Sequence, residues 1–113
     1  MKLGAFSISL TVNDIQKSKE FYENLGFTKL GGDISQKWLI LKNGNAIIGL
    51  FEGMFDKNII TFNPGWDESC QNLETFDDVR IIQEHLKKCG IQLTSEADTT
   101  SKGPAHITLT DPD

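Results

Sequence analysis

The most informative stretch of the chain, residues 6–27, reads FSISLTVNDIQKSKEFYENLGF. It begins with alternating apolar and polar residues, the period of a half-buried strand. The period changes at Asp14, which is placed to cap a helix, and Gly26 stands where a left-handed residue ends one. We therefore predict a strand followed directly by a short helix, whose apolar positions cover the apolar face of the strand. That strand face comprises Ile8, Leu10 and Val12, and the helical positions are Ile15, Phe21, Tyr22 and Leu25.

The opposite face of this strand carries only Ser7, Ser9 and Thr11. Two interpretations remain open at this point. The face is in contact with water, or it belongs to a reactive site from which the reactive residues are missing.

Length and composition restrict the class of protein. The chain has 113 residues, 38% of them hydrophobic and 24% charged, which suits one globular domain. Its formal net charge of −5 argues against nucleic acid or an anionic membrane as a general partner. No apolar run reaches the roughly 20 residues that a membrane span needs, and the N-terminus lacks signal-peptide features, so we expect a cytoplasmic location.

The two cysteines give no motif. Cys89 falls on an apolar helical stripe and is interpreted as a small buried residue, whereas Cys70 lies in a polar segment. We expect no disulfide between them.

A hairpin follows the first helix. After a strand at 27–30 and a turn at 31–33, the runs KWLILK and AIIGLFE are separated by Asn43-Gly44, a strong signal for a type I′ turn. The predicted register pairs Lys42 with Asn45, Ile40 with Ile47, and Trp38 with Gly49. One face then carries Trp38, Ile40, Ile47, Gly49 and Phe51, and the other carries Leu39, Leu41, Ile48 and Leu50.

The same order of elements recurs in the second half. A strand is predicted at 58–62, a capping box at Thr75 and Asp78, a helix ending at Gly90, and strands at 91–97 and 105–110. Such a recurrence is typical of a duplicated βαβββ unit. The second copy has a polar insertion before its helix, and we expect its last strand to be missing from this chain.

These residues resemble the vicinal oxygen chelate superfamily, which includes glyoxalase I, bleomycin-resistance proteins and extradiol dioxygenases. The resemblance rests on LTVNDIQKSKEFYENLGF at 10–27 and TDPD at 110–113, and it extends over the whole chain. It implies an α+β fold of paired βαβββ modules, whose curled mixed sheet forms a cup with helices outside. We expect one domain, 1–113, with module one at 1–53 and an incomplete module two at 54–113.

The resemblance also implies where a divalent metal would be bound. The family's ligand positions correspond to Ser7, Gly49 and Asn58, with a fourth position beyond Asp113. A hydroxyl, a hydrogen and a neutral amide are poor donors for a catalytic metal ion, which takes three or four His, Glu, Asp or Cys ligands. We therefore expect no metal site and no cofactor, with a divalent metal as the alternative.

If the alignment holds, the cup is lined by apolar and aromatic residues with a few polar groups, as small-molecule sites are. His106 is either hydrogen-bonded at a sheet rim or in contact with a ligand, and Trp66 is either a core anchor or a ligand lid. Gly49 is expected to leave room where an enzyme would hold a carboxylate. The predicted ligand-binding residues are Ser7, Ser9, Trp38, Gly49, Phe51, Asn58, Phe62, Trp66, His106 and Thr108, with Thr11, Ile40, Ile47 and Ile60 on the same face.

Three functions follow as hypotheses. The first is a metal-free domain that binds a small organic molecule, as bleomycin-resistance proteins do. The second is a metal-dependent lyase or isomerase of the glyoxalase kind, or a dioxygenase. The third is a domain whose cup is filled by its own side chains and which serves only in association. On resemblance we also expect a homodimer.

Overall fold

The computed structural model describes residues 1–67 and 69–112. Its elements in chain order are β1 (Ala5–Val12), α1 (Ile15–Asn24), β2 (Thr28–Asp33), the 3₁₀ turn η1 (Ile34–Gln36), β3 (Trp38–Asn43), β4 (Ala46–Glu52), β5 (Ile59–Asn63) and α2 (Val79–Lys88).

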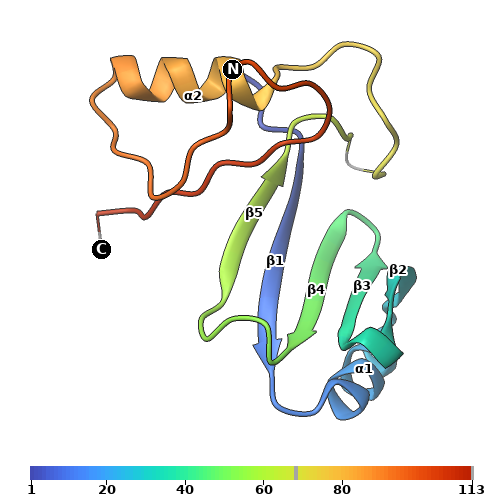
Figure 1. Ribbon diagram of the computed structural model, residues 1–113. Helices are drawn as coiled ribbons and strands as arrows, with labels where there is room; N and C mark the ends of the chain where they lie inside the picture. The colour runs from blue at the N-terminus through green and yellow to red at the C-terminus, as the bar shows by residue number, and fades with distance from the viewer. Residues whose placement is uncertain (68, 113) are drawn as a thin grey trace.

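The strands form one mixed sheet in the order β2-β3-β4-β1-β5 (Figure 1). β1 runs parallel to β4 and antiparallel to β5, while β2, β3 and β4 pair antiparallel to one another. The parallel pair β1 and β4 is possible because α1 and the β2–β3 hairpin connect them, as a parallel crossover requires. The α+β class predicted from the sequence is confirmed.

Helix α1 covers one face of the sheet. The Asp14 carboxylate accepts a hydrogen bond from the Lys17 amide at 3.2 Å, and Gly26 has a φ of 95°, so both predicted helix boundaries are confirmed. Ile15 is buried against Leu39, Leu41 and Leu50, which are at most 1% exposed.

The prediction that Phe21 and Leu25 cover β1 is wrong, because they are 59% and 57% exposed. Ile15 and Tyr22 are seven residues apart and share a helical face, so Tyr22 packs on the core instead. Phe21 lies about 100° around the helix from Tyr22, and Leu25 is already the C-cap.

The β3–β4 hairpin has a register two residues away from the predicted one. Asn43 pairs with Ala46 and Ile40 with Gly49, so the turn residues are Gly44 and Asn45. Gly44 has a φ of 60° whereas Asn45 has no positive φ, which matches a type II′ turn with glycine at its first central position. Because side chains alternate with a period of two, a slip of two residues leaves every predicted face unchanged.

The predicted turn at 31–33 is instead part of β2. Gly31 pairs with Ile40 and Gly32 with Leu39 after a register shift that begins at Lys29. A Cβ on Gly32 would lie 2.8 Å from the Leu39 Cα, and Gly32 has a φ of 94°. These glycines therefore allow a β-bulge and a close approach of two backbones.

The second half departs further from the prediction. Asp78 caps α2, three residues after Thr75. The segments 91–97 and 105–110 meet at an isolated bridge between Ser95 and Thr108, with a further hydrogen bond from the Thr94 amide to the Thr108 carbonyl, and not in a strand ladder. The Gln83 side-chain amide takes both the N–H and the C=O of Ala97, at 2.7 and 3.1 Å. A backbone group held in this way is not available for a strand ladder.

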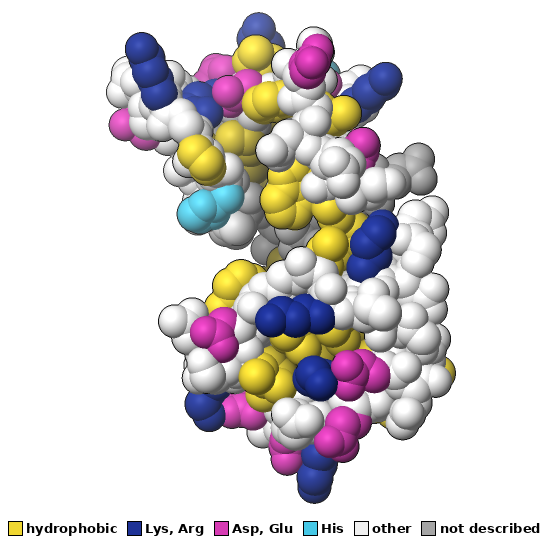
Figure 2. Space-filling model, turned by 90° about the vertical axis from the view of Figure 1, so that its right-hand side faces the viewer, with side chains coloured by type: hydrophobic (Ala, Val, Ile, Leu, Met, Phe, Trp, Pro, Cys, Tyr) yellow, Lys and Arg dark blue, Asp and Glu magenta, His cyan; other side chains and the backbone are white. Residues whose placement is uncertain are grey.

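Helix α2 lies beyond the end of the sheet and packs on the segment 94–103 rather than on a strand (Figure 1). The radius of gyration is 15.4 Å, compared with about 13 Å for a compact domain of this length. Figure 2 shows the molecule hollowed between the part around α2 and the part around α1, with hydrophobic side chains at the surface of the hollow. None of the described helices is long and apolar enough to span a membrane.

Candidate functional site

The sheet face opposite α1, which we call the open face, collects half of the predicted site. β-Sheet register places Ser9 beside Gly49, Gly49 beside Ile40, and Phe51 beside Trp38, all on this face. Ser7 lies beside Thr61 of β5. The prediction from the sequence that five residues share one face agrees with the register of the sheet: Ser7, Ser9, Trp38, Gly49 and Phe51.

Aromatic rings fill the space over Gly49. A Cβ at this position would lie 2.6 Å from Phe51 Cε2 and 3.2 Å from Ile40 Cδ1. The Phe51 ring stacks with Trp38 at a centroid distance of 6.5 Å and contacts Phe55 at 5.2 Å. The expectation that Gly49 leaves an open space is wrong, because the glycine accommodates the neighbouring ring.

The residues at the family's metal positions do not form a donor set. The Asn58 side-chain oxygen accepts a hydrogen bond from the Thr11 amide at 3.0 Å, and it thereby joins the chain before β5 to the end of β1. Ser7 offers a neutral hydroxyl and Gly49 no side chain. Within 1–67 and 69–112 no three His, Cys, Asp or Glu residues come together in a way that could hold a metal ion.

Two predicted residues of β5 lie on the other face of the sheet. Phe62 pairs with Phe6 across β1 and β5, and their rings lie 5.3 Å apart on the face opposite Ser7, so its placement in the cup is wrong. Ile60 pairs with Ile8 and is on that same face. In the structure Ile59 and Thr61 of β5 lie beside Ser9 and Ser7, whereas the prediction placed Ile60 and Phe62 on that face. Side chains alternate along a strand, so an error of one residue exchanges its two faces.

His106 and Thr108 belong to the coil after α2 rather than to a strand. His106 is exposed and forms no hydrogen bond within the described structure. The Thr108 hydroxyl lies 2.7 Å from the Thr94 hydroxyl and 2.8 Å from that of Ser95. The expected strand alternation therefore does not bring His106 and Thr108 to the open face.

Trp66 lines a cavity of about 530 Å³ at the end of the sheet where β1 begins and β5 ends. We call it the Trp66 cavity, and its lining comes from residues 63–66, 72–73, 76–80 and 103–105. Trp66 and Phe76 are 40% and 52% exposed, so their rings remain available for contact. The volume lies within the range of about 300–1,000 Å³ that is usual for small-molecule sites.

The polar insertion before α2 positions Trp66. The Trp66 carbonyl accepts a hydrogen bond from the Ala5 amide at 3.0 Å, and the Leu73 amide donates to the Gly65 carbonyl at 2.9 Å. A bridge also joins Trp66 to Asn72. The insertion is therefore folded back on itself and fixed to the start of β1.

Arg80, the only arginine of the chain, connects the two sides of the cavity. Its guanidinium donates to the Asp78 carboxylate at 3.0 and 3.2 Å, to Ser101 Oγ at 3.1 Å, and to the carbonyls of Gly103 and Asp98 at 2.8 and 3.3 Å. The Arg80 amide and guanidinium together hold the pKa of Asp78 below its ordinary value. The segment 98–103 is thereby fixed to the first turn of α2.

Sequence reasoning identified Trp66 but missed Phe76, Leu73 and Arg80. The signal for Phe76 was the same as for Trp66, a large aromatic residue within a polar segment. The role of Arg80 depends on contacts with residues 18 to 23 positions later in the chain. No local pattern indicates such contacts.

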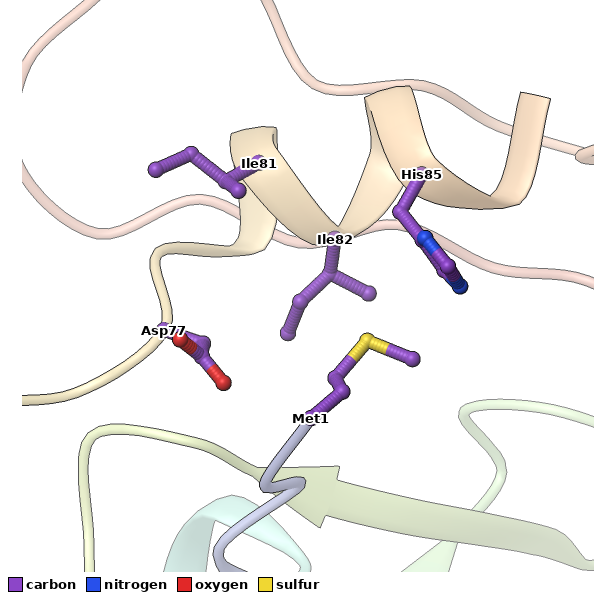
Figure 3. A pocket seen from close by; sticks show the side chains of 5 residues that line it. All are labelled: Met1, Asp77, Ile81, Ile82 and His85. Carbon is purple, nitrogen blue, oxygen red and sulfur yellow. The ribbon is translucent and has the colours of Figure 1, made fainter. Parts of the chain in front are cut away.

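A second, smaller cavity of about 260 Å³ lies between the N-terminus and α2 (Figure 3). Met1 and His85 line it together with Asp77, Ile81 and Ile82. Cys89, expected to be buried, is exposed, and its Sγ lies 3.6 Å from His85 Nε2. Helix α2 has fewer buried positions than its apolar pattern predicts because the sheet does not cover it.

Comparison with known proteins supports the assignment that the fold and the first motif suggest. The sequence profile of the Glyoxalase/Bleomycin resistance protein/Dioxygenase superfamily matches residues 4–113. The chain belongs to this superfamily. No curated protein and no solved structure shows a significant match. The profile match establishes the glyoxalase superfamily. The ligand, the metal site and the specific function have to be inferred from the residues of this chain.

Proposed function

We propose that this glyoxalase-superfamily domain binds a small organic molecule in the Trp66 cavity without the divalent metal of the family's enzymes. The observation that carries the proposal is the cavity itself. It combines a volume of about 530 Å³ with two partly exposed aromatic rings and the apolar side chains of Leu73 and Val79. A predominantly apolar lining with a few polar groups is the usual character of a small-molecule site.

The family's metal positions support the metal-free part of the proposal. Asn58 offers one neutral oxygen that already accepts the Thr11 amide, and the Phe51 ring fills the space over Gly49. A carboxylate introduced at Gly49 would have to displace this ring. The open face thus lacks the charged donors that a divalent ion needs.

The two tryptophans make the proposal testable in solution. Nuclear magnetic resonance of 15N-labelled protein gives one indole N–H signal each for Trp38 and Trp66, and Trp38→Phe assigns them. Saturable titration with 1-naphthalenemethanol, a flat neutral probe, should shift the Trp66 signal and leave the Trp38 signal unmoved. Shifts confined to Trp38 would instead place the ligand on the open face.

Metal content separates this function from the metal-dependent alternative. We expect elemental analysis of the purified protein to show less than one divalent ion per chain, and a chelator to leave the thermal midpoint and probe binding unchanged. A stoichiometric ion whose removal lowers both would favour a glyoxalase-like lyase, isomerase or dioxygenase.

We further propose that the domain acts as a homodimer in the cytoplasm. β5 forms an edge of the sheet, and its Ile60 and Phe62 are 65% and 47% exposed. Both cysteines are free thiols, as is usual in a reducing compartment. Light scattering during size-exclusion chromatography tests the dimer, and fractionation of the source cells tests the location.

A further inference from the structure

We infer that the Trp66 cavity selects flat aromatic molecules that are neutral or positively charged, and rejects anions. This inference rests on the proposed function and specifies the ligand class of the same site. It follows from how the charged groups of the lining are already used.

Arg80 is the only cationic side chain among the described residues of the lining, and its donors are already in use. The five hydrogen bonds of Arg80 to Asp78, Asp98, Ser101 and Gly103 equal the five N–H donors of a guanidinium. Its side chain is only 14% exposed. A ligand carboxylate or phosphate would have to break this set before it could pair with Arg80.

The N-terminus of α2 is already occupied by the carboxylate of its own cap, Asp78. The Asp78 carboxylate accepts the Arg80 amide at 2.8 Å, and the Asp78 carbonyl accepts the Ile81 amide at 2.9 Å. An ionised cap already complements the partial positive charge of this helix end. A second anion there would be repelled by the Asp78 carboxylate.

Asp77 leaves the lining with a net negative charge. Among the described residues that line the cavity, Asp77, Asp78 and Arg80 carry charged side chains, so two carboxylates and one guanidinium sum to −1. Asp77 Oδ2 accepts the Lys2 amide at 3.0 Å, and no described residue donates to Oδ1. Asp77 lines this cavity and also the smaller one beside Met1. A cation in the Trp66 cavity would be attracted by this carboxylate and by the aromatic faces of Trp66 and Phe76.

Three naphthalene probes of similar shape test the selection. 1-Naphthylmethylammonium is cationic, 1-naphthalenemethanol is neutral and 1-naphthoate is anionic, and each is titrated while the Trp66 indole signal is followed. We expect the cation and the neutral probe to bind at least about tenfold more tightly than the anion. Equal or tighter binding of 1-naphthoate would overturn the inference and leave the proposed function intact, whereas failure of all three to shift Trp66 would overturn both.

Asp77→Asn tests the source of the preference with little change in shape. Asparagine keeps an oxygen that can accept the Lys2 amide, so the fold is expected to persist, which the dispersion of the amide signals will verify. The variant should lose about three- to tenfold in affinity for the ammonium probe and nothing for the neutral one. Asp56→Asn, an exposed carboxylate outside the cavity, is the matched control, and an equal loss in the control would contradict the role of Asp77.

Discussion

At the scale of single residues, Gly49 shows how a missing side chain can have two different meanings. From the sequence it is an empty position where an enzyme would carry a ligand. In the structure the Phe51 ring and Ile40 occupy that space, and Phe51 also stacks on Trp38. The glycine is therefore needed for packing, and the metal position is closed by neighbouring apolar groups.

Gly49→Ala should lower the free energy of unfolding by about 1–2 kcal/mol, because the new methyl group overpacks against Phe51. Urea denaturation followed by circular dichroism measures this change. Gly31→Ala is the control, since Gly31 has no atom within 4 Å of a Cβ and no positive φ, and it should cost nothing. The cost of Gly49→Ala should also largely disappear when Phe51 is alanine, and its persistence there would contradict the packing explanation.

At the scale of elements, Glu52 fixes α1 to the end of β4. One carboxylate oxygen accepts the Ile15 amide at 3.0 Å, and the other accepts the Lys37 ammonium at 2.6 Å. These hydrogen bonds, the Lys37 one first, hold the pKa of Glu52 below its ordinary value. A lowered folded-state pKa stabilises the protein above the unfolded pKa, and this contribution is lost as the pH falls through the folded value.

Glu52→Gln should therefore be less stable than the native chain at neutral pH, and the difference should close as the pH falls below the ordinary glutamate value of 4.5. Urea midpoints measured from pH 7 to pH 3 give this comparison. Glu74→Gln, at an exposed residue without a hydrogen bond in the described structure, is the matched control for the change of charge. A constant gap between Glu52→Gln and the native chain over the whole range would exclude the ionised carboxylate as the cause.

At the scale of the whole molecule, the two edges of the sheet differ in how they are protected. β2 contains Lys29, a bulge and two glycines, features that discourage pairing with another chain. β5 reads IITFN and has no charge, and among the described strands it pairs with β1 alone. An antiparallel second copy centred on Thr61 would place Ile60 against Phe62 of that copy, a favourable cross-strand pair.

Ile60→Lys should weaken self-association by placing two lysines at this interface. Because Ile60 is 65% exposed, the change should alter the stability of the isolated chain by no more than about 0.5 kcal/mol. Analytical ultracentrifugation over a range of concentrations measures the association. Lys57→Ala, before the edge strand, serves as the comparison, and an unchanged dimer in Ile60→Lys would move the interface away from β5.

The sequence alone determined the elements whose causes are local. Asp14 and Gly26 bound α1 because capping and left-handed φ depend on single residues, and the hairpin faces survived an error of two residues because side chains alternate with a period of two. The family suggested by the motifs at 10–27 and 110–113 is confirmed by the profile that matches residues 4–113. Three features depend on distant contacts and could be seen only in the folded chain: the face on which Phe62 lies, the ring over Gly49, and the five hydrogen bonds of the Arg80 guanidinium. These features arise where segments far apart in the chain meet, and no short pattern of residues specifies such a meeting.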